Sequence, residues 1–247
     1  MPLPKATPAL LRQLAQRYNT PGFIAADPVQ FPHRYTAKTD IEISAFVTAW
    51  ISWGNRKQIV STAQRLHTDI FGNDPTGYLQ SREWERYRGS TDCFYRTVRF
   101  GDFCQLMERL HSVYSQHADL EDCVVANLAA CGGDPAQALG SVFSGIAGIA
   151  DPCKKSPCKR LWLFLRWMVR RDGIVDLGVW RRLQPAQLVI PLDTHVHHTA
   201  LMLGVTTRHT ADITTARQIT DRFRTIFPDD PALGDFALFG YGMENGI

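Results

Sequence analysis

Hydrophobic residues recur every three to four positions along most of the chain, which is the spacing of amphipathic helices. The segment 39–54, TDIEISAFVTAWISWG, is apolar almost all round, so it predicts a central helix with Thr39 and Glu42 as a capping box. Alternation with a period of two, which is typical of strands, is weak everywhere. The pattern therefore predicts an all-α protein.

Capping residues and breaks divide this pattern into separate helices. Thr7 followed by Pro8 marks a helix start, and the Gly- and Pro-rich segments 131–135 and 227–236 are breaks. Helices are expected at 7–18, 39–54, 55–72, within 98–118, and at 119–131, 135–148, 159–171 and 212–226, with another after Asp193.

The composition is that of an ordinary soluble protein: 247 residues, 45% hydrophobic and 21% charged. A net charge of +3 permits an anionic partner without demanding one. The six cysteines form no CxxC pair, so we expect reduced thiols and no iron–sulfur cluster. The first residues lack a signal-peptide core, and no long apolar run predicts a membrane span. We expect a cytoplasmic protein that does not bind membranes.

The segment 191–205, PLDTHVHHTALMLGV, gathers Asp193, His195, His197 and His198. Its Asp-x-His-x-His pattern is that of metal-dependent amidohydrolases, but their TIM barrel needs roughly 200 residues and only 49 follow His198. The helical spacing after Asp193 instead makes Asp193 or Thr194 an N-cap. A private metal site on the three histidines stays open as an alternative, although we expect no metal and no other cofactor.

The segment 154–171, KKSPCKRLWLFLRWMVRR, contains seven Lys and Arg residues and no acid. We expect Ser156 to cap a largely buried helix on which Lys159, Arg166 and Arg170 lie within about 20° of one line. Such a stripe fits phosphates, and its alternative is internal pairing with acids. The candidate partners for internal pairing are Asp172, Asp176 and Asp40.

Three segments resemble the helix-hairpin-helix DNA glycosylase superfamily. The most specific is VIPLDTHVHHTALMLGV, and the other two are 46–66 and the closing segment 236–242, FALFGYG. Together they span about three-quarters of the chain in the family's order. In the first segment the resemblance falls on Pro191, Asp193, Thr194, His195, Val196, Ala200, Leu203 and Gly204.

The chain also departs from that superfamily. It lacks the Leu-Pro-Gly-Val-Gly hairpin, a nucleophile at 173–175 and the iron–sulfur cysteines of some members. It is more similar to the divergent archaeal 8-oxoguanine glycosylases, whose lysine sits further upstream. It further resembles, over most of its length, the bacterial family called domain of unknown function 2400, which supplies no activity.

The resemblance implies a helical barrel at 38–188 and a second lobe built from 1–37 and 189–247. It implies a DNA repair glycosylase that excises a damaged base, such as an oxidised purine, from double-stranded DNA. Asp193 would stabilise charge on the sugar, and Lys159 would be the Schiff-base lysine that permits strand cleavage. The residues expected to hold DNA are Trp53, Asn55, Arg56, Lys57, Arg166, Arg170 and His195.

Two other functions remain open at this stage. One is a nucleic-acid-binding module of the same fold without chemistry, which the missing hairpin glycines favour. The other is a metal-dependent hydrolase built on the histidine cluster. No obligate protein partner is evident, and a DNA-binding protein of this kind would associate with the nucleoid.

Overall fold

The computed structural model describes residues 6–246, which form two compact units. The central unit runs from Ala26 to Asp151, and the terminal unit combines the chain up to Ala25 with the chain from Pro152 onward. The sequence predicts a barrel between residues 38 and 188. In the structure, residues 152–188 belong instead to the terminal unit. Among the described residues, no helix combines the length and apolar character needed to cross a membrane.

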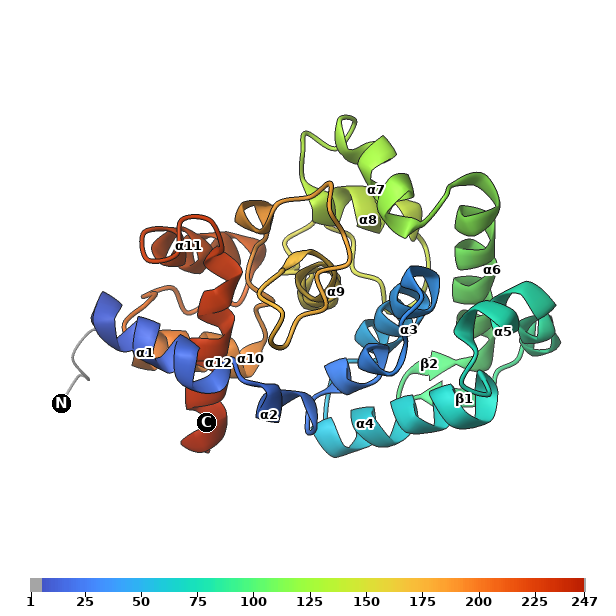
Figure 1. The fold of residues 1–247 in the computed structure, drawn as a ribbon, viewed down its shortest axis with the longest axis horizontal. Helices are drawn as coiled ribbons and strands as arrows, with labels where there is room; N and C mark the ends of the chain where they lie inside the picture. Colours follow the sequence, from blue (N-terminus) through green and yellow to red (C-terminus); the bar gives the residue numbers. More distant parts are fainter. Residues whose placement is uncertain (1–5, 247) are drawn as a thin grey trace. The chain divides into compact units, whose positions relative to one another are not determined.

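The central unit is helical apart from one short hairpin (Figure 1). Strand β1 pairs antiparallel with β2, with Tyr95 opposite Val98. Its elements are η1 (Pro28–Gln30), η2 (Pro32–Arg34), α3 (Lys38–Trp50), α4 (Arg56–Arg65), the π-turn η3 (Leu66–Ile70), α5 (Pro75–Ser81), η4 (Glu83–Tyr87), β1 (Cys93–Tyr95), β2 (Val98–Arg99), α6 (Phe100–Gln116), α7 (Leu120–Leu128) and α8 (Pro135–Val142).

Helix α3 is the core of the central unit, as its all-round apolar pattern predicts. Every residue from Ile41 to Trp50 is buried. The predicted capping box is wrong, because α3 begins at Lys38 behind Ala37 and the buried Glu42 carboxylate instead accepts from Tyr114 Oη at 2.8 Å. The described helices form no closed barrel, so the predicted helical barrel is wrong.

The terminal unit is also all helical, which confirms the predicted fold class. Helix α12 lies at its centre and packs on α1 and α10 (Figure 1). The elements of this unit are α1 (Pro8–Tyr18), α2 (Pro21–Ile24), α9 (Lys159–Val169), η5 (Pro185–Gln187), α10 (Thr194–Met202), α11 (Ile213–Arg224), η6 (Pro231–Leu233) and α12 (Gly234–Glu244).

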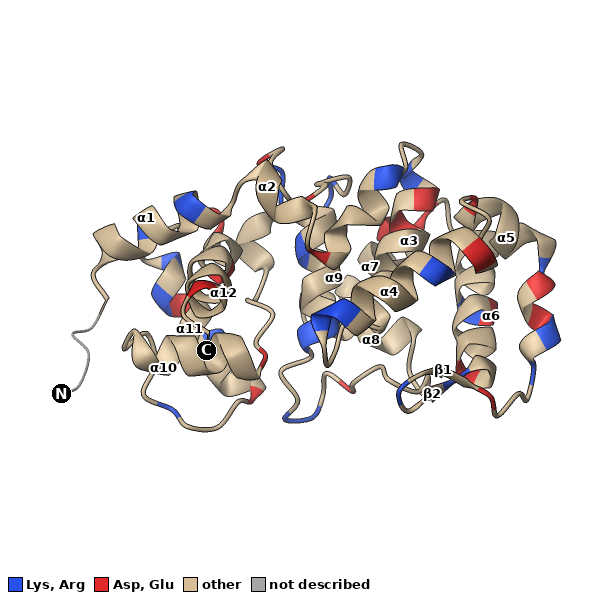
Figure 2. Cartoon of the chain, turned by 90° about the horizontal axis from the view of Figure 1, so that it is seen from below, with Lys and Arg blue, Asp and Glu red and all other residues tan. Residues whose placement is uncertain are grey.

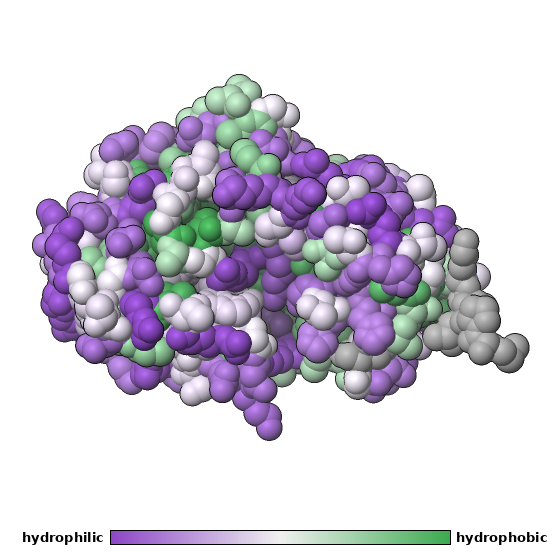
Figure 3. Space-filling model, turned by 180° about the vertical axis from the view of Figure 1, so that it is seen from behind, coloured by the Kyte–Doolittle hydropathy of each residue, from purple (hydrophilic) through white to green (hydrophobic). Residues whose placement is uncertain are grey.

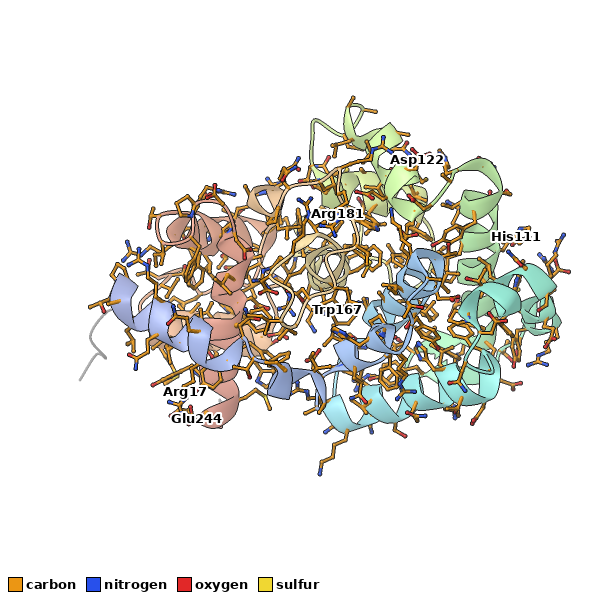
Figure 4. The ribbon with its side chains drawn as sticks, in the orientation of Figure 1. Arg17, His111, Asp122, Trp167, Arg181 and Glu244 are labelled. Carbon is orange, nitrogen blue, oxygen red and sulfur yellow. The ribbon has the colours of Figure 1, made fainter. Side chains whose placement is uncertain are left out.

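Two glycines allow α12 to pack this closely. A Cβ atom at Gly240 would overlap the ring of Tyr18 on α1, and one at Gly234 would overlap the ring of Phe223 on α11. Beyond these contacts, Arg17 forms an ion pair with Glu244 where α1 meets the end of α12 (Figure 4).

The hydropathy of the surface, the distribution of charged residues and the state of the cysteines are those of an ordinary globular protein. The face drawn in Figure 3 is mainly hydrophilic, and hydrophobic residues reach it only in limited areas. Figure 2 shows Lys and Arg interleaved with Asp and Glu along the helices. All six cysteines are free thiols, as the sequence predicts.

Candidate active site

Lys159 is the first residue of α9. The residue before it, Cys158, has a left-handed backbone with φ of 49°, so the chain turns sharply into the helix. The predicted Ser156 cap is wrong, because Ser156 Oγ accepts from the Cys158 amide at 3.2 Å and the helix begins later. This turn directs the Lys159 side chain away from the buried part of α9, with 26% of it exposed.

Asp193 is the N-cap of α10. Its backbone is extended, and its Oδ1 accepts from the Val196 amide at 2.9 Å, which is the capping bond predicted from the sequence. The other carboxylate oxygen, Oδ2, is directed elsewhere. The cap therefore fixes the carboxylate while one of its oxygens remains available for a second interaction.

That second interaction is with Lys159. Its Nζ lies 3.6 Å from Asp193 Oδ2, and both side chains are 26% exposed. The sequence analysis paired these two residues, and the structure brings their side chains together at the beginnings of α9 and α10. An amine beside a fixed carboxylate, with solvent reaching both, is an arrangement suited to nucleophilic attack and proton transfer.

A third charged residue, Asp235, lies in the first turn of α12, and the charges of Lys159 and Asp193 act on it. It is 4% exposed, and its Oδ2 accepts from Arg166, which follows Lys159 by two helical turns on the same side of α9. Burial raises the pKa of Asp235 to about 6, Arg166 opposes this, and the negative charge of Asp193 adds to it.

Arg166 on α9 and Arg170, which follows the last residue of this helix, belong to an internal ion network. Arg166 also pairs with Asp176 at 3.3 Å, and Arg170 pairs with Asp176 and, at 2.8 Å, with Asp172. Asp230 bonds Arg170 Nε at 2.9 Å. Burial would lower the pKa of Arg170, but these carboxylates raise it overall.

This network changes how the basic stripe is interpreted. Arg166 is 3% exposed and Arg170 is not exposed, so neither guanidinium can reach a phosphate and both are withdrawn as DNA contacts. The alternative of internal pairing is confirmed for Asp172 and Asp176. The third candidate, Asp40, instead accepts from the Thr76 amide at 3.0 Å in the central unit.

The histidines of the DTHVHH segment do not converge. His197 is buried, and its Nε2 lies 2.8 Å from the Arg208 carbonyl oxygen, whereas His195 and His198 are exposed. Among residues 6–246, no three His, Cys, Asp or Glu side chains are grouped so that they could hold a metal ion. Within the described part of the chain, the three histidines therefore do not form a metal site with other His, Cys, Asp or Glu side chains.

The expected DNA-contacting corner, 53–57, lies in the central unit. Asn55 caps α4 by accepting from Lys57 N at 2.9 Å, and Arg56 pairs with Asp27 at 2.8 Å. The Trp53 ring packs edge-on against Tyr95, with 4.8 Å between the centroids. Within this corner Lys57 and Asn55 are exposed, so they remain candidates for contacts with an anion.

Comparison with known protein families gives one match. A family model described as protein of unknown function (DUF2400) matches residues 27–244. The chain belongs to the DUF2400 family. Searches of curated proteins and of solved structures gave no match.

The DUF2400 match includes the whole charged site of the terminal unit, from Lys159 through Asp193 to Asp235. Sequence reasoning missed Asp235 and Asp230, which it treated as part of the break at 227–236. A signal for them was present, because a buried helix that carries Arg166 and Arg170 needs buried counter-charges. Asp235, next to the apolar run FALFG, is such an acid.

Proposed function

We propose that this protein is a DNA glycosylase that also cleaves the strand, with Lys159 as nucleophile and Asp193 as its partner. The observation that carries the proposal is the 3.6 Å separation of Lys159 Nζ and Asp193 Oδ2 at an exposed pair of helix starts. The resemblance of the Asp193 segment to the helix-hairpin-helix glycosylases supplies the reaction class, and the substrate is a damaged base in duplex DNA.

The chemistry needs an amine and a carboxylate within reach of one sugar. With the nucleotide flipped out of the duplex, the neutral Lys159 amine attacks C1′ as the bond from C1′ to the base breaks. The base leaves with the bonding electrons and takes a proton from water. The Asp193 carboxylate stabilises the positive charge that develops on the sugar, and it then accepts a proton from the attacking nitrogen.

Strand cleavage follows from the same intermediate. The nitrogen lone pair expels O4′, which takes the proton that Asp193 had accepted, and an iminium ion between Lys159 and C1′ results. Loss of a proton from C2′ then breaks the bond from C3′ to oxygen, and the phosphate leaves with those electrons. Water releases the lysine. Every step uses side chains of the chain, water and the substrate.

The remaining contacts with DNA are modest. Lys57, Asn55 and His195 are exposed candidates for backbone contacts, and Trp53 is half-buried. With a net charge of +3 and both signs interleaved along the helices, we expect weak duplex binding that is lost as salt rises (Figure 2).

The proposal is tested by base release and strand cleavage on duplexes that each contain one oxidised purine. Lys159→Gln should abolish strand cleavage, and Asp193→Asn should abolish base release while keeping the helix cap, because Asn caps about as well as Asp. Lys155→Gln is the matched control for the lysine, since Lys155 is exposed in the loop just before α9.

A matched control also exists for the aspartate. Asp212 caps α11 by accepting from the Thr215 amide at 2.8 Å, so Asp212→Asn makes the same change at a neighbouring helix start. Both controls should react as the natural protein does. Salt-sensitive DNA binding with no base release from any lesion would reject the glycosylase and favour the binding module.

A further inference from the structure

Asp235 has one carboxylate oxygen that no described group satisfies. Its Oδ2 accepts from Arg166, whereas Oδ1 is buried without a hydrogen-bond partner. A buried polar atom without a partner costs about 1–3 kcal/mol, so such an atom in a native protein calls for an explanation.

The need to neutralise Arg166 does not supply that explanation. Arg166 already pairs with Asp176, and the network contains more carboxylates than guanidinium groups. The carboxylates of Asp172, Asp176, Asp230 and Asp235 contact the guanidinium groups of Arg166 and Arg170, and of these four only Asp176 and Asp235 are buried. Arg166 thus has a second buried counter-charge in Asp176, so its neutralisation alone does not account for the unpartnered oxygen of Asp235.

Asp235 contacts α9 on the side of the helix that also carries Lys159 of the exposed Lys159–Asp193 pair. Arg166 is seven residues after Lys159 on α9, so the two share one side of the helix, and Asp235 lies against that side. The charges that act on Asp235 are those of Arg166, Asp193, Lys159 and Asp176. Helix α1, which also packs on α12, forms its ion pair at the far end, between Arg17 and Glu244.

We propose that Asp235 is a positioning residue, whose buried carboxylate acts electrostatically on the Lys159–Asp193 pair. Its carboxylate favours the positive charge that the nitrogen of Lys159 carries in the iminium ion. The catalytic consequence rests on the proposed function: Asp235 would stabilise the iminium ion without touching the substrate. In a buried setting such a charge acts more strongly than it would in water.

The electrostatic coupling is tested without any reaction, by following the Asp235 carboxyl carbon by NMR as a function of pH. Asp193→Asn removes a negative neighbour, so the pKa of Asp235 should fall from its natural value of about 6. Lys159→Gln removes a positive neighbour, so this pKa should rise. A general loosening of the fold would not move it in opposite directions.

The control for that titration is Asp212→Asn, which changes a helix cap elsewhere in the terminal unit and should leave the Asp235 titration unchanged. If neither Asp193→Asn nor Lys159→Gln moves the titration, the coupling does not exist and the inference is overturned. Opposite shifts support it, whether or not the protein acts on DNA.

The catalytic consequence is tested by the single-turnover rate of covalent trapping on damaged duplex. Asp235→Asn should lower that rate on the order of 10²-fold, with DNA affinity unchanged. Asp235→Glu should restore part of the rate. Asp230→Asn is the matched control, because it removes a carboxylate of the same network that pairs with Arg170 only.

The outcomes separate the two proposals. A natural protein that traps no DNA rejects the proposed function and leaves the titration to decide the role of Asp235. A natural protein that traps DNA, with an Asp235→Asn variant that traps equally fast, retains the function and rejects the positioning role. Equal losses in Asp235→Asn and Asp230→Asn would assign the effect to the network's stability, and would also reject that role.

Discussion

Lys159 is the first residue of α9, and Asp193 is the N-cap of α10. The Asp193 carboxylate that caps α10 also forms an ion pair with Lys159, with 3.6 Å between Oδ2 and Nζ. One oxygen of Asp193 serves the cap and the other faces the amine. A structural role and a chemical role therefore coexist in one side chain, and only substitutions that preserve the cap can separate them.

Arg170 is fully buried in the ion network of the terminal unit, so we expect it to contribute to stability and not to DNA binding. Arg170→Met removes a fully buried cation from the buried Asp176 and from the partly exposed Asp172 and Asp230, so it should lower the free energy of unfolding by about 3–5 kcal/mol. Denaturant titration measures this loss. The salt dependence of DNA binding, measured on the folded variant, should keep its natural slope.

Arg224→Met is the matched control for Arg170→Met. Arg224 pairs with Asp221 at the surface, so its loss should cost at most about 1 kcal/mol. A stable Arg170→Met variant with a reduced salt slope would contradict this account and return Arg170 to the phosphate-binding surface.

Close packing of α1 on α12 depends on Gly240. Gly240→Ala places a methyl group in the ring of Tyr18, so the helices must separate, at a cost of about 1–3 kcal/mol. Thermal unfolding compares it with Gly22→Ala, where the added methyl group lies 3.8 Å from its nearest neighbour, Thr20 Oγ1. Equal stability of the two variants would show that α1 does not pack on α12 as described.

Local sequence patterns predicted the helices well because capping and periodicity are local properties. Thr7, Asn55 and Asp193 are followed by helices that begin as expected. The pairing of Lys159 with Asp193 needed more than this, since it came from the spacing in a resembling family. The sequence supplied both residues, and only the folded chain supplied the distance.

The basic stripe and the Glu42 capping box were misinterpreted for the same physical reason. The partner of a buried charge is determined by tertiary packing, which local sequence patterns do not contain. Arg166 and Arg170 form a cationic stripe on the helix, yet Asp235 and Asp230, which lie 69 and 60 residues further along the chain, pair with them. Glu42 likewise fitted a capping box, but α6 packs on α3 and Tyr114 binds its carboxylate instead.

His67 should make the central unit sensitive to acid. Its Nδ1 donates to the Ala63 carbonyl at 2.8 Å and its Nε2 accepts from Ser44 Oγ at 2.7 Å, an arrangement that requires the neutral ring. Burial lowers the pKa of His67 from 6.5 to about 4. The stabilising contribution is complete above pH 6.5 and is lost as the pH falls toward 4, by about 3 kcal/mol in total.

The measurement compares the pH dependence of unfolding in the natural protein and in His67→Gln. The difference between them isolates His67 from Glu42, whose pKa is raised by burial to about 6 and whose contribution changes with the opposite sign. The natural protein should lose stability relative to the variant between pH 6.5 and 4. Parallel curves would mean that His67 takes up a proton equally well in the folded state.

The central claim is that Lys159 forms a covalent bond to the sugar of a damaged nucleotide, and borohydride trapping tests it most directly. The protein is incubated with duplex DNA that contains an oxidised purine, reduced with borohydride, digested, and mapped by mass spectrometry. The account predicts one adduct, on Lys159, that persists in Lys155→Gln and disappears in Lys159→Gln. An adduct on any other lysine, or base release without an adduct, would contradict it.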